Sequence, residues 1–85
     1  MRKILFEKEA WEEFHEWISI DRRNALKIAE LIEDILSDPF IGKGKPEPLK
    51  HDKKGLWSRR ITLEHRLVYK VEENEIIIIA CKYHY

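Results

Sequence analysis

The chain has 85 residues, a formal net charge of zero and a charged fraction of 38%. A chain of this length builds one small core, so we expect a single domain spanning residues 1–85. Its longest wholly apolar run, Ile76 to Cys81, is far shorter than the roughly 20 residues of a membrane helix, and no signal-peptide pattern opens the chain. The single cysteine, Cys81, cannot form an intrachain disulfide and suits a reducing compartment. These features argue against a membrane protein or a disulfide scaffold and predict a cytoplasmic domain.

A short strand at residues 2–6 and two amphipathic helices are predicted first. From Lys8 to about Ile20, apolar residues recur at the spacing of a helix with one buried face: Ala10, Trp11, Phe14, Trp17 and Ile18. Asp21 is suited to cap a second helix, which ends at Asp38-Pro39 because a residue before proline avoids helical geometry. The apolar stripe of this second helix contains Ala25, Ile28, Ala29, Ile32, Ile35 and Leu36. We expect both helices to be scaffold.

Three strands are predicted after a Gly- and Pro-rich loop at residues 40–48. They lie at about residues 56–62, 65–71 and 75–83, and their short connections make them antiparallel neighbours. Glu73-Asn74 is suited to the last turn, since asparagine tolerates positive φ. Because residues 76–80 are apolar without alternation, we expect that strand to be central and covered on both faces. The pattern predicts an α+β fold with two N-terminal helices packed on a small, mainly antiparallel, twisted sheet.

The zero net charge hides a basic middle segment. Residues 39–70 carry 9 Lys/Arg against 3 Asp/Glu, whereas residues 1–38 carry 6 against 10. A basic strip in an otherwise acidic domain is typical of a polyanion site, because each neutralised phosphate releases counterions. A solvated lysine-rich loop is the alternative for the lysines, but arginines on strands are better phosphate ligands.

The predicted topology brings several of these cations toward the C-terminal residues. Folding at the last turn places Arg66 near Cys81 and Lys82, and therefore near Tyr83 and His84. Folding at about Leu63 places Arg59 or Arg60 at the same end of the sheet. Cations and the C-terminal histidine therefore meet at one end of the sheet.

Together with Glu47, whose backbone is fixed by flanking prolines, these residues match the needs of metal-free RNA cleavage. A base must deprotonate the ribose 2′-hydroxyl, an acid must protonate the leaving 5′-oxygen, and a cation must stabilise the phosphate charge. Glu47, His84 and Arg66 fit these roles. The predicted products are a 2′,3′-cyclic phosphate and a 5′-hydroxyl, and DNA should be inert because it lacks the 2′-hydroxyl.

Each of these residues also has an ordinary interpretation. Glu47 can solvate a loop, Arg66 can pair with Glu64 or Glu75, and His84 can be a frayed terminal residue. The carboxylates of the basic segment are few and scattered, so neither a metal nor another cofactor is expected.

Four segments closely resemble the YoeB/Txe toxins, a branch of the RelE/ParE superfamily of bacterial toxin–antitoxin systems. These segments are GKGKPEPLKH (residues 42–51), WSRRIT (57–62), EHRLVY (64–69) and ACKYHY (80–85). The resemblance implies a RelE-like, microbial-RNase-like fold and a ribosome-dependent messenger-RNA endonuclease that acts in the ribosomal A site. It also implies inhibition by a YefM-like antitoxin, and frequent dimers in the family suggest a homodimer.

The resemblance also assigns site residues. It implies that the catalytic residues are Glu47, Arg66, His84 and Tyr85. The candidate RNA- and ribosome-binding residues are Lys43, Lys45, Lys50, His51, Arg59 and Arg60.

Two alternatives on the same fold act by binding alone. One is a ParE-like inhibitor of a target such as gyrase, and the other is a protein that blocks translation by occupying the ribosome. Glu47, His84 and Tyr85 argue against both, since pure binding does not require an acid and a base placed together.

Overall fold

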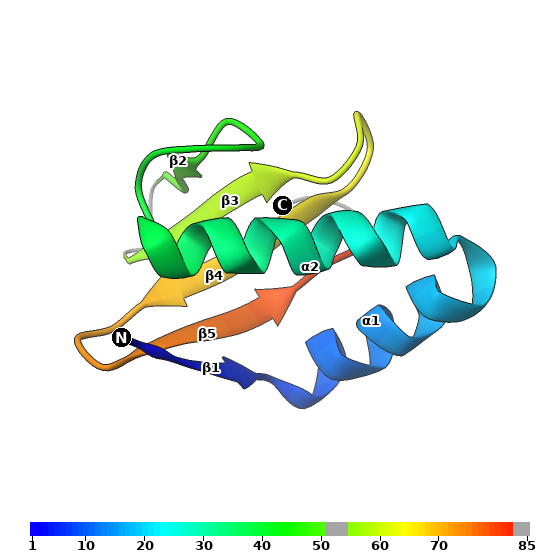
Figure 1. Cartoon of the computed structure of the whole chain (residues 1–85), viewed down its shortest axis with the longest axis horizontal. Coiled ribbons are helices and arrows are strands. Elements are labelled where there is room, and N and C mark those ends of the chain that lie inside the picture. Colours follow the sequence, from blue (N-terminus) through cyan, green and yellow to red (C-terminus); the bar gives the residue numbers. More distant parts are fainter. Residues whose placement is uncertain (51–54, 83–85) are drawn as a thin grey trace.

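The computed structural model describes residues 1–50 and 55–82 and has two helices on one side of a five-stranded sheet (Figure 1). The elements are β1 (Lys3–Phe6), α1 (Lys8–Ile20), α2 (Arg22–Ser37), β2 (Glu47–Pro48), β3 (Leu56–Arg60), β4 (Arg66–Val71) and β5 (Glu75–Ala80). The strand order is β1-β5-β4-β3-β2, with β1 parallel to β5 and the other neighbours antiparallel. The predicted α+β fold is confirmed, although β2 lies in a segment that was predicted to be a loop. No helix in the described part of the chain is long and apolar enough to cross a membrane.

The helix boundaries follow the predicted signals, but the buried faces differ from the predicted stripes. The Asp21 side chain accepts a hydrogen bond from the Arg23 N–H at 3.1 Å, and α2 ends one residue before the extended Asp38. Leu31, which was left out of the predicted stripe, is buried, whereas Ala29 is exposed. The residues of α2 that are buried are Ala25, Ile28, Leu31 and Ile35. Periodicity alone fixes a helix face only to within about one residue, and contact with the sheet decides the rest.

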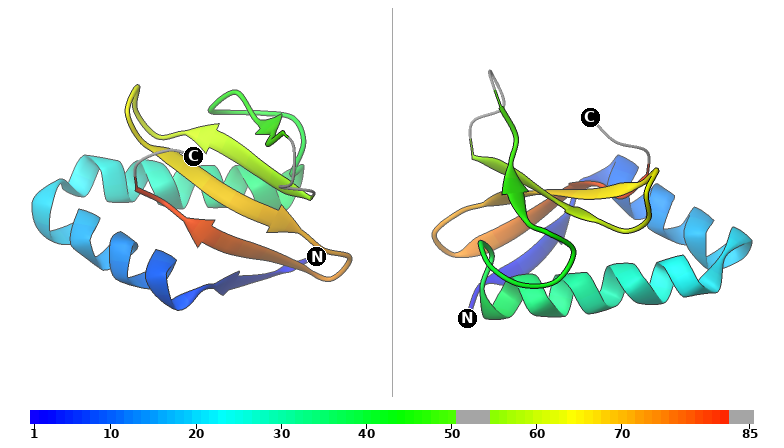
Figure 2. Two further views of the ribbon diagram at one scale, coloured as in Figure 1. Left: turned by 180° about the vertical axis from the view of Figure 1, so that it is seen from behind. Right: turned by 90° about the horizontal axis from the view of Figure 1, so that it is seen from above.

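Strand β5 is an inner strand, as predicted, but the prediction that both its faces are covered was wrong. Both helices lie on the same side of the sheet (Figure 2), and Ile77 and Ile79 remain partly exposed while Ile76 and Ile78 are buried. The turn before β5 is closed by a hydrogen bond from the Glu72 N–H to the Glu75 oxygen at 2.9 Å. Asn74 does not adopt the positive φ that was expected there.

A β-bulge interrupts the pairing of β4 with β5. Tyr69 pairs with Ile78 but Val68 pairs with Ala80, so Ile79 is an extra residue. The bulge reverses the alternation, and as a result Cys81 belongs to the helix-facing core. This agrees with the prediction that Cys81 is a small core residue.

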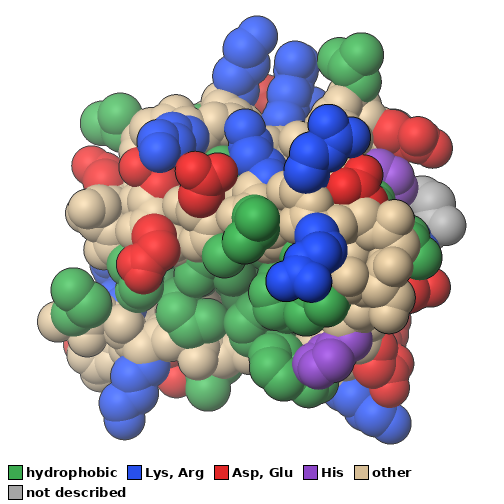
Figure 3. Space-filling model, turned by 45° about the vertical axis from the view of Figure 1, so that its right-hand side comes forward, with side chains coloured by type: hydrophobic (Ala, Val, Ile, Leu, Met, Phe, Trp, Pro, Cys, Tyr) green, Lys and Arg blue, Asp and Glu red, His purple; other side chains and the backbone are tan. Residues whose placement is uncertain are grey.

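The two helices leave an apolar groove on their outer side. Its lining consists of Phe14, Ile18, Arg22, Ala25, Leu26 and Ala29. Figure 3 shows hydrophobic side chains gathered across the middle of a helix-bearing face. The groove therefore lies on a different face from the predicted cation cluster.

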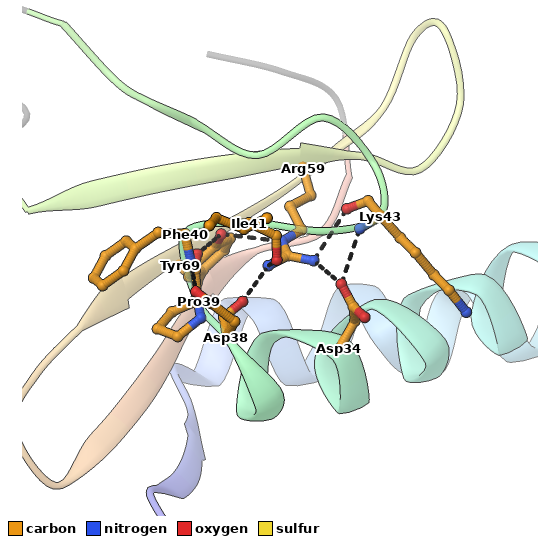
Figure 4. A network of polar contacts seen from close by, with 8 residues as sticks. All are labelled: Asp34, Asp38, Pro39, Phe40, Ile41, Lys43, Arg59 and Tyr69. Atoms are coloured by element: carbon orange, nitrogen blue, oxygen red, sulfur yellow. Dashed lines mark hydrogen bonds and ion pairs between the residues drawn. The ribbon is translucent and has the colours of Figure 1, made fainter.

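A buried guanidinium joins α2, the following loop and the sheet (Figure 4). The Arg59 side chain is 0% exposed. All five of its N–H donors have acceptors: Nη1 donates to Asp34 Oδ2 (2.5 Å) and the Lys43 oxygen (3.1 Å), Nη2 to the Asp38 oxygen (2.7 Å) and the Ile41 oxygen (3.3 Å), and Nε to the Tyr69 hydroxyl (3.1 Å). The expectation that Arg59 contacts RNA was therefore wrong, because its side chain has no exposed surface and its donors are already bonded.

The partners of Arg59 are themselves fixed. The Tyr69 hydroxyl donates to the Pro39 oxygen at 2.6 Å, and burial raises the pKa of this tyrosine. Asp34 also accepts the Lys43 N–H at 2.9 Å. A Cβ on Gly42, whose φ is +136°, would lie 2.0 Å from Asp34 Oδ2, so only glycine fits there. The loop that leads to β2 is consequently held in one conformation.

We expect Arg59→Met to lower the free energy of unfolding by about 3 kcal/mol, because it removes every hydrogen bond by which the buried guanidinium joins Asp34, Tyr69 and the loop carbonyls. Urea unfolding followed by tryptophan fluorescence measures the change. Arg60→Met is the matched control, since Arg60 is exposed on the next residue of β3 and should change stability by only about 0.5 kcal/mol. Equal losses in the two variants would contradict the structural role of Arg59.

The same network predicts a pH dependence. The backbone N–H of Lys43 and the guanidinium of Arg59 hold the pKa of Asp34 below its ordinary value of 3.8. A lowered pKa stabilises the fold above 3.8, and this contribution is lost as the pH falls through the folded-state value. The stability difference between wild type and Asp34→Asn should therefore stay constant from neutral pH to about pH 5 and shrink below pH 4. Urea unfolding across this range tests the expectation, and a difference that grows on acidification would contradict it.

Candidate active site

Three strands contribute one residue each to a polar cluster on the sheet face opposite the helices. Glu47 pairs with Ser58 across β2 and β3, and Ser58 pairs with Val68 across β3 and β4. Arg66 lies two residues before Val68 and so shares its face. Arg66 Nη1 donates to Glu47 Oε1 at 2.9 Å and to Ser58 Oγ at 3.1 Å. The candidate base and the candidate phosphate-binding cation are therefore in direct contact.

This pairing differs from the ordinary interpretation of Arg66. Among the described residues, the carboxylate that pairs with Arg66 is that of Glu47. It is not that of Glu64 or Glu75. The Glu47 side chain is 57% exposed and that of Arg66 is 22% exposed, whereas Ser58 is fully buried. Ser58 therefore anchors the guanidinium from below, and the carboxylate faces solvent.

The backbone around Glu47 is held at both ends. The Gly44 oxygen accepts the Arg60 N–H at 2.7 Å, and the Leu49 N–H donates to the Leu56 oxygen at 2.9 Å. Between them, Lys45 has a φ of +53°, which is uncommon for a residue other than glycine. Glu47 therefore projects from a short edge strand whose flanking residues, before and after it, are both hydrogen-bonded to β3.

Apart from the buried Arg59, the other described cations that were predicted to bind RNA are exposed, but Lys43 lies beside α2 and not beside this cluster (Figure 4). Arg60 pairs with Arg66 in the strand register, which agrees with the prediction that Arg59 or Arg60 lies at this end of the sheet, and Arg60 is exposed. Lys43, Lys45 and Lys50 are exposed on the segments that flank β2. These four cations can meet a polyanion, whereas the buried Arg59 cannot.

The arrangement can bind an anion beside a carboxylate. Within residues 1–50 and 55–82, Arg66 donates through Nη1 alone, which leaves three of its five N–H donors for a ligand. An anion held by those donors would lie next to Glu47.

The described part of the chain contains no group of three or more His, Cys, Asp or Glu residues that could hold a metal ion. Burial, reinforced by the Glu13 carboxylate, raises the pKa of the Cys81 thiol to about 12, so this thiol stays protonated.

Three predicted site residues, His51, His84 and Tyr85, lie outside the described residues. The register that pairs Val68 with Ala80 places Arg66 at the end of β4 where Cys81 and Lys82 follow β5, in line with the predicted convergence.

Sequence reasoning missed two contributions to this end of the sheet. Ser58 stands two residues before Arg60 in WSRRIT, so strand alternation was the signal that could have found it. The contacts of Glu13 and Trp17 with Cys81 join residues more than sixty positions apart and left no local signal.

Comparison with known proteins identifies the family of the chain. The family model of the YoeB-like toxin of bacterial type II toxin-antitoxin systems matches residues 6–85. Toxin YoeB of Escherichia coli strain K12 is 53% identical over 83 residues, which cover 98% of this chain and 99% of the relative. The YoeB dimer from Staphylococcus aureus has a TM-score of 0.93 at 44% identity and covers 99% of this chain and 98% of its own. The YoeB-YefM complex from Staphylococcus aureus has a TM-score of 0.89 at 42% identity and covers 100% and 99%. The chain belongs to the YoeB-like toxins of bacterial type II toxin-antitoxin systems.

Proposed function

We propose that this toxin is a metal-independent endoribonuclease that cleaves messenger RNA in the ribosomal A site and thereby inhibits translation. The observation that supports the proposal most directly is the 2.9 Å contact between Arg66 Nη1 and Glu47 Oε1 on an accessible sheet face. A phosphate bound by the other donors of Arg66 would place the adjacent ribose within reach of the carboxylate.

The proposed reaction is an internal transesterification. Glu47 takes the proton of the 2′-hydroxyl, and the 2′-oxygen forms a bond to the adjacent phosphorus. The bond from phosphorus to the 5′-oxygen breaks, and His84 gives its proton to that leaving oxygen. Arg66 stabilises the added negative charge on the phosphate. The products are a 2′,3′-cyclic phosphate and a 5′-hydroxyl, with no net oxidation or reduction.

The other site residues have supporting roles in this proposal. Tyr85 stacks on a base or donates a hydrogen bond near the scissile phosphate. Arg60, Lys43, Lys45 and Lys50, together with His51, contact the message or ribosomal RNA.

Dependence on the ribosome follows from the weakness of a carboxylate base. A carboxylate deprotonates a ribose hydroxyl poorly unless the two groups are held in good geometry. The Glu47 carboxylate is largely exposed, so the domain itself does little to enclose a flexible RNA. We propose that the ribosome supplies the missing constraint by presenting the message in a fixed conformation.

The deciding experiment is primer extension on a defined message in chelator, with and without programmed ribosomes. Wild type should cut only on ribosomes, and His84→Ala and Glu47→Gln should each lower the single-turnover rate about 10²–10⁴-fold, the usual range for losing an acid or a base. His15→Ala is the matched control, because His15 is exposed on α1 and contacts the Trp11 oxygen.

The other outcomes separate the binding-only alternatives. Intact message with stalled translation would indicate that the toxin acts by occupying the ribosome. Intact message with normal translation would direct attention to a target such as gyrase. Equally fast cleavage of free RNA would contradict the proposed role of the ribosome.

We also propose that a YefM-like antitoxin inhibits this chain by covering the exposed cations, since a Staphylococcus aureus relative forms a YoeB-YefM complex. Another Staphylococcus aureus structure is a YoeB dimer, and we propose that this toxin alone is likewise a homodimer. Charge attraction should make antitoxin association fast at low salt. Stopped-flow measurements should show several-fold slower association for Lys45→Ala and Arg60→Ala but not for Lys8→Ala, an exposed lysine on α1. Equal rates would contradict the location of the antitoxin surface, and a monomer in sedimentation equilibrium would contradict the dimer.

A further inference from the structure

The point where the chain leaves β5 is attached to α1 by side chains rather than by the sheet. Cys81 follows the last paired residue of β5, and its main-chain N–H donates to Glu13 Oε1 at 2.8 Å. Its main-chain oxygen accepts the indole N–H of Trp17 at 2.7 Å. Both polar groups of this residue, which a strand partner would otherwise satisfy, are therefore held by one helix.

The next residue is held by the same helix. Lys82 Nζ donates to Glu16 Oε1 at 2.8 Å and lies 5.8 Å from the centre of the Trp17 ring. The Lys82 side chain is only 13% exposed. Glu13, Glu16 and Trp17 are spaced by three and four residues and share one face of α1. We call this face, made of Glu13, Glu16 and Trp17, the tail mount.

The tail mount also contacts the residue that immediately precedes β4. The His65 ring lies edge-on to the Trp17 ring, with centres 4.7 Å apart, and Arg66 is the next residue. One tryptophan is thus in contact with the residue before β4 and with the residues that follow β5. This contact therefore connects the residue before Arg66 with Cys81 and Lys82, in addition to the pairing of β4 with β5.

The chain is short beyond this mount. His84 is three residues after Cys81, and three extended residues span at most about 10 Å. Fixing the main chain of Cys81 therefore restricts where His84 can go, whereas a terminal segment without such an anchor frays. A displacement of only about 1 Å can lower a rate about 10²-fold.

We propose that Glu13, acting with Trp17 through the main chain of Cys81, is a positioning residue for the C-terminal general acid. The inference rests on the proposed ribonuclease function, because it assigns Glu13 to the step in which His84 protonates the leaving oxygen. Glu13 does not touch RNA in this proposal. It lies on a different element from Glu47 and Arg66 and acts by holding the start of the tail.

The bond itself suggests a discriminating set of variants. Glu13→Ala removes the acceptor for the Cys81 N–H, whereas Glu13→Gln keeps an oxygen acceptor and loses only the charge. Glu12→Ala is the matched control, because Glu12 is the preceding residue of α1 and its partner is the exposed Lys8 at 3.9 Å.

The experiment measures single-turnover cleavage on saturating programmed ribosomes, and ribosome affinity, for each variant. Glu13→Ala should lower the cleavage rate at least about 10-fold while the ribosome Kd changes less than about threefold, since the cations that bind RNA are unaffected. Glu13→Gln should stay within about threefold of wild type, and Glu12→Ala should match wild type. In a His84→Ala background, Glu13→Ala should cause no further loss, because residues acting in one step are not additive.

A merely structural role would give a different pattern. Equal cleavage rates for Glu13→Ala and wild type, or an additive loss in the double variant, would overturn the inference and leave the ribonuclease proposal standing. Intact message with wild type would overturn both proposals. If Glu13→Ala does not fold, Glu16→Ala, which removes only the bond from Lys82 Nζ to Glu16, takes its place. It should lower the rate a few-fold at unchanged Kd, and a wild-type rate would count against the inference.

Discussion

The structure depends most on one buried cation. Taking a guanidinium out of water costs several kcal/mol, and the cost is offset only when every donor has an acceptor. Arg59 meets this condition by bonding to the Asp34 carboxylate, the Tyr69 hydroxyl and three loop carbonyls. These acceptors belong to α2, to β4 and to the loop that leads to β2. The position of Glu47, which follows this loop, is thus linked to the core.

Strand alternation gives two adjacent arginines opposite roles. Arg59 faces the helices and is buried, whereas Arg60 faces the open side of the sheet and is exposed. Ser58 shares the side of Arg60 and supports Arg66 from beneath. The sheet therefore separates the buried Arg59 on one face from Arg60 and Arg66 on the other. Basic residues that are close in the sequence lie on one face of the sheet only where strand alternation points their side chains to that face.

The end of β5 beside Arg66 is held by a helix that contributes no residue to the polar cluster. The bulge at Ile79 turns Cys81 toward the core, where Glu13 and Trp17 hold its main chain. Without the extra residue the alternation would place Cys81 on the open face, away from α1. The bulge, the helix face and the start of the C-terminal tail consequently form one unit. This unit adjoins β4 through the contact between Trp17 and His65.

The sequence by itself determined the two helices, the first strand and the antiparallel order of the last three strands, because periodicity, capping and turn signals are local. It also singled out Glu47 and Arg66 as candidate site residues. It could not determine which arginine of the SRR segment is buried, that β5 has one open face, or that Glu13 binds the main chain of Cys81. Those features depend on register, on the bulge and on contacts between residues up to 68 positions apart. Only the tertiary structure decides them, since a shift of one residue in a strand moves every side chain to the other face.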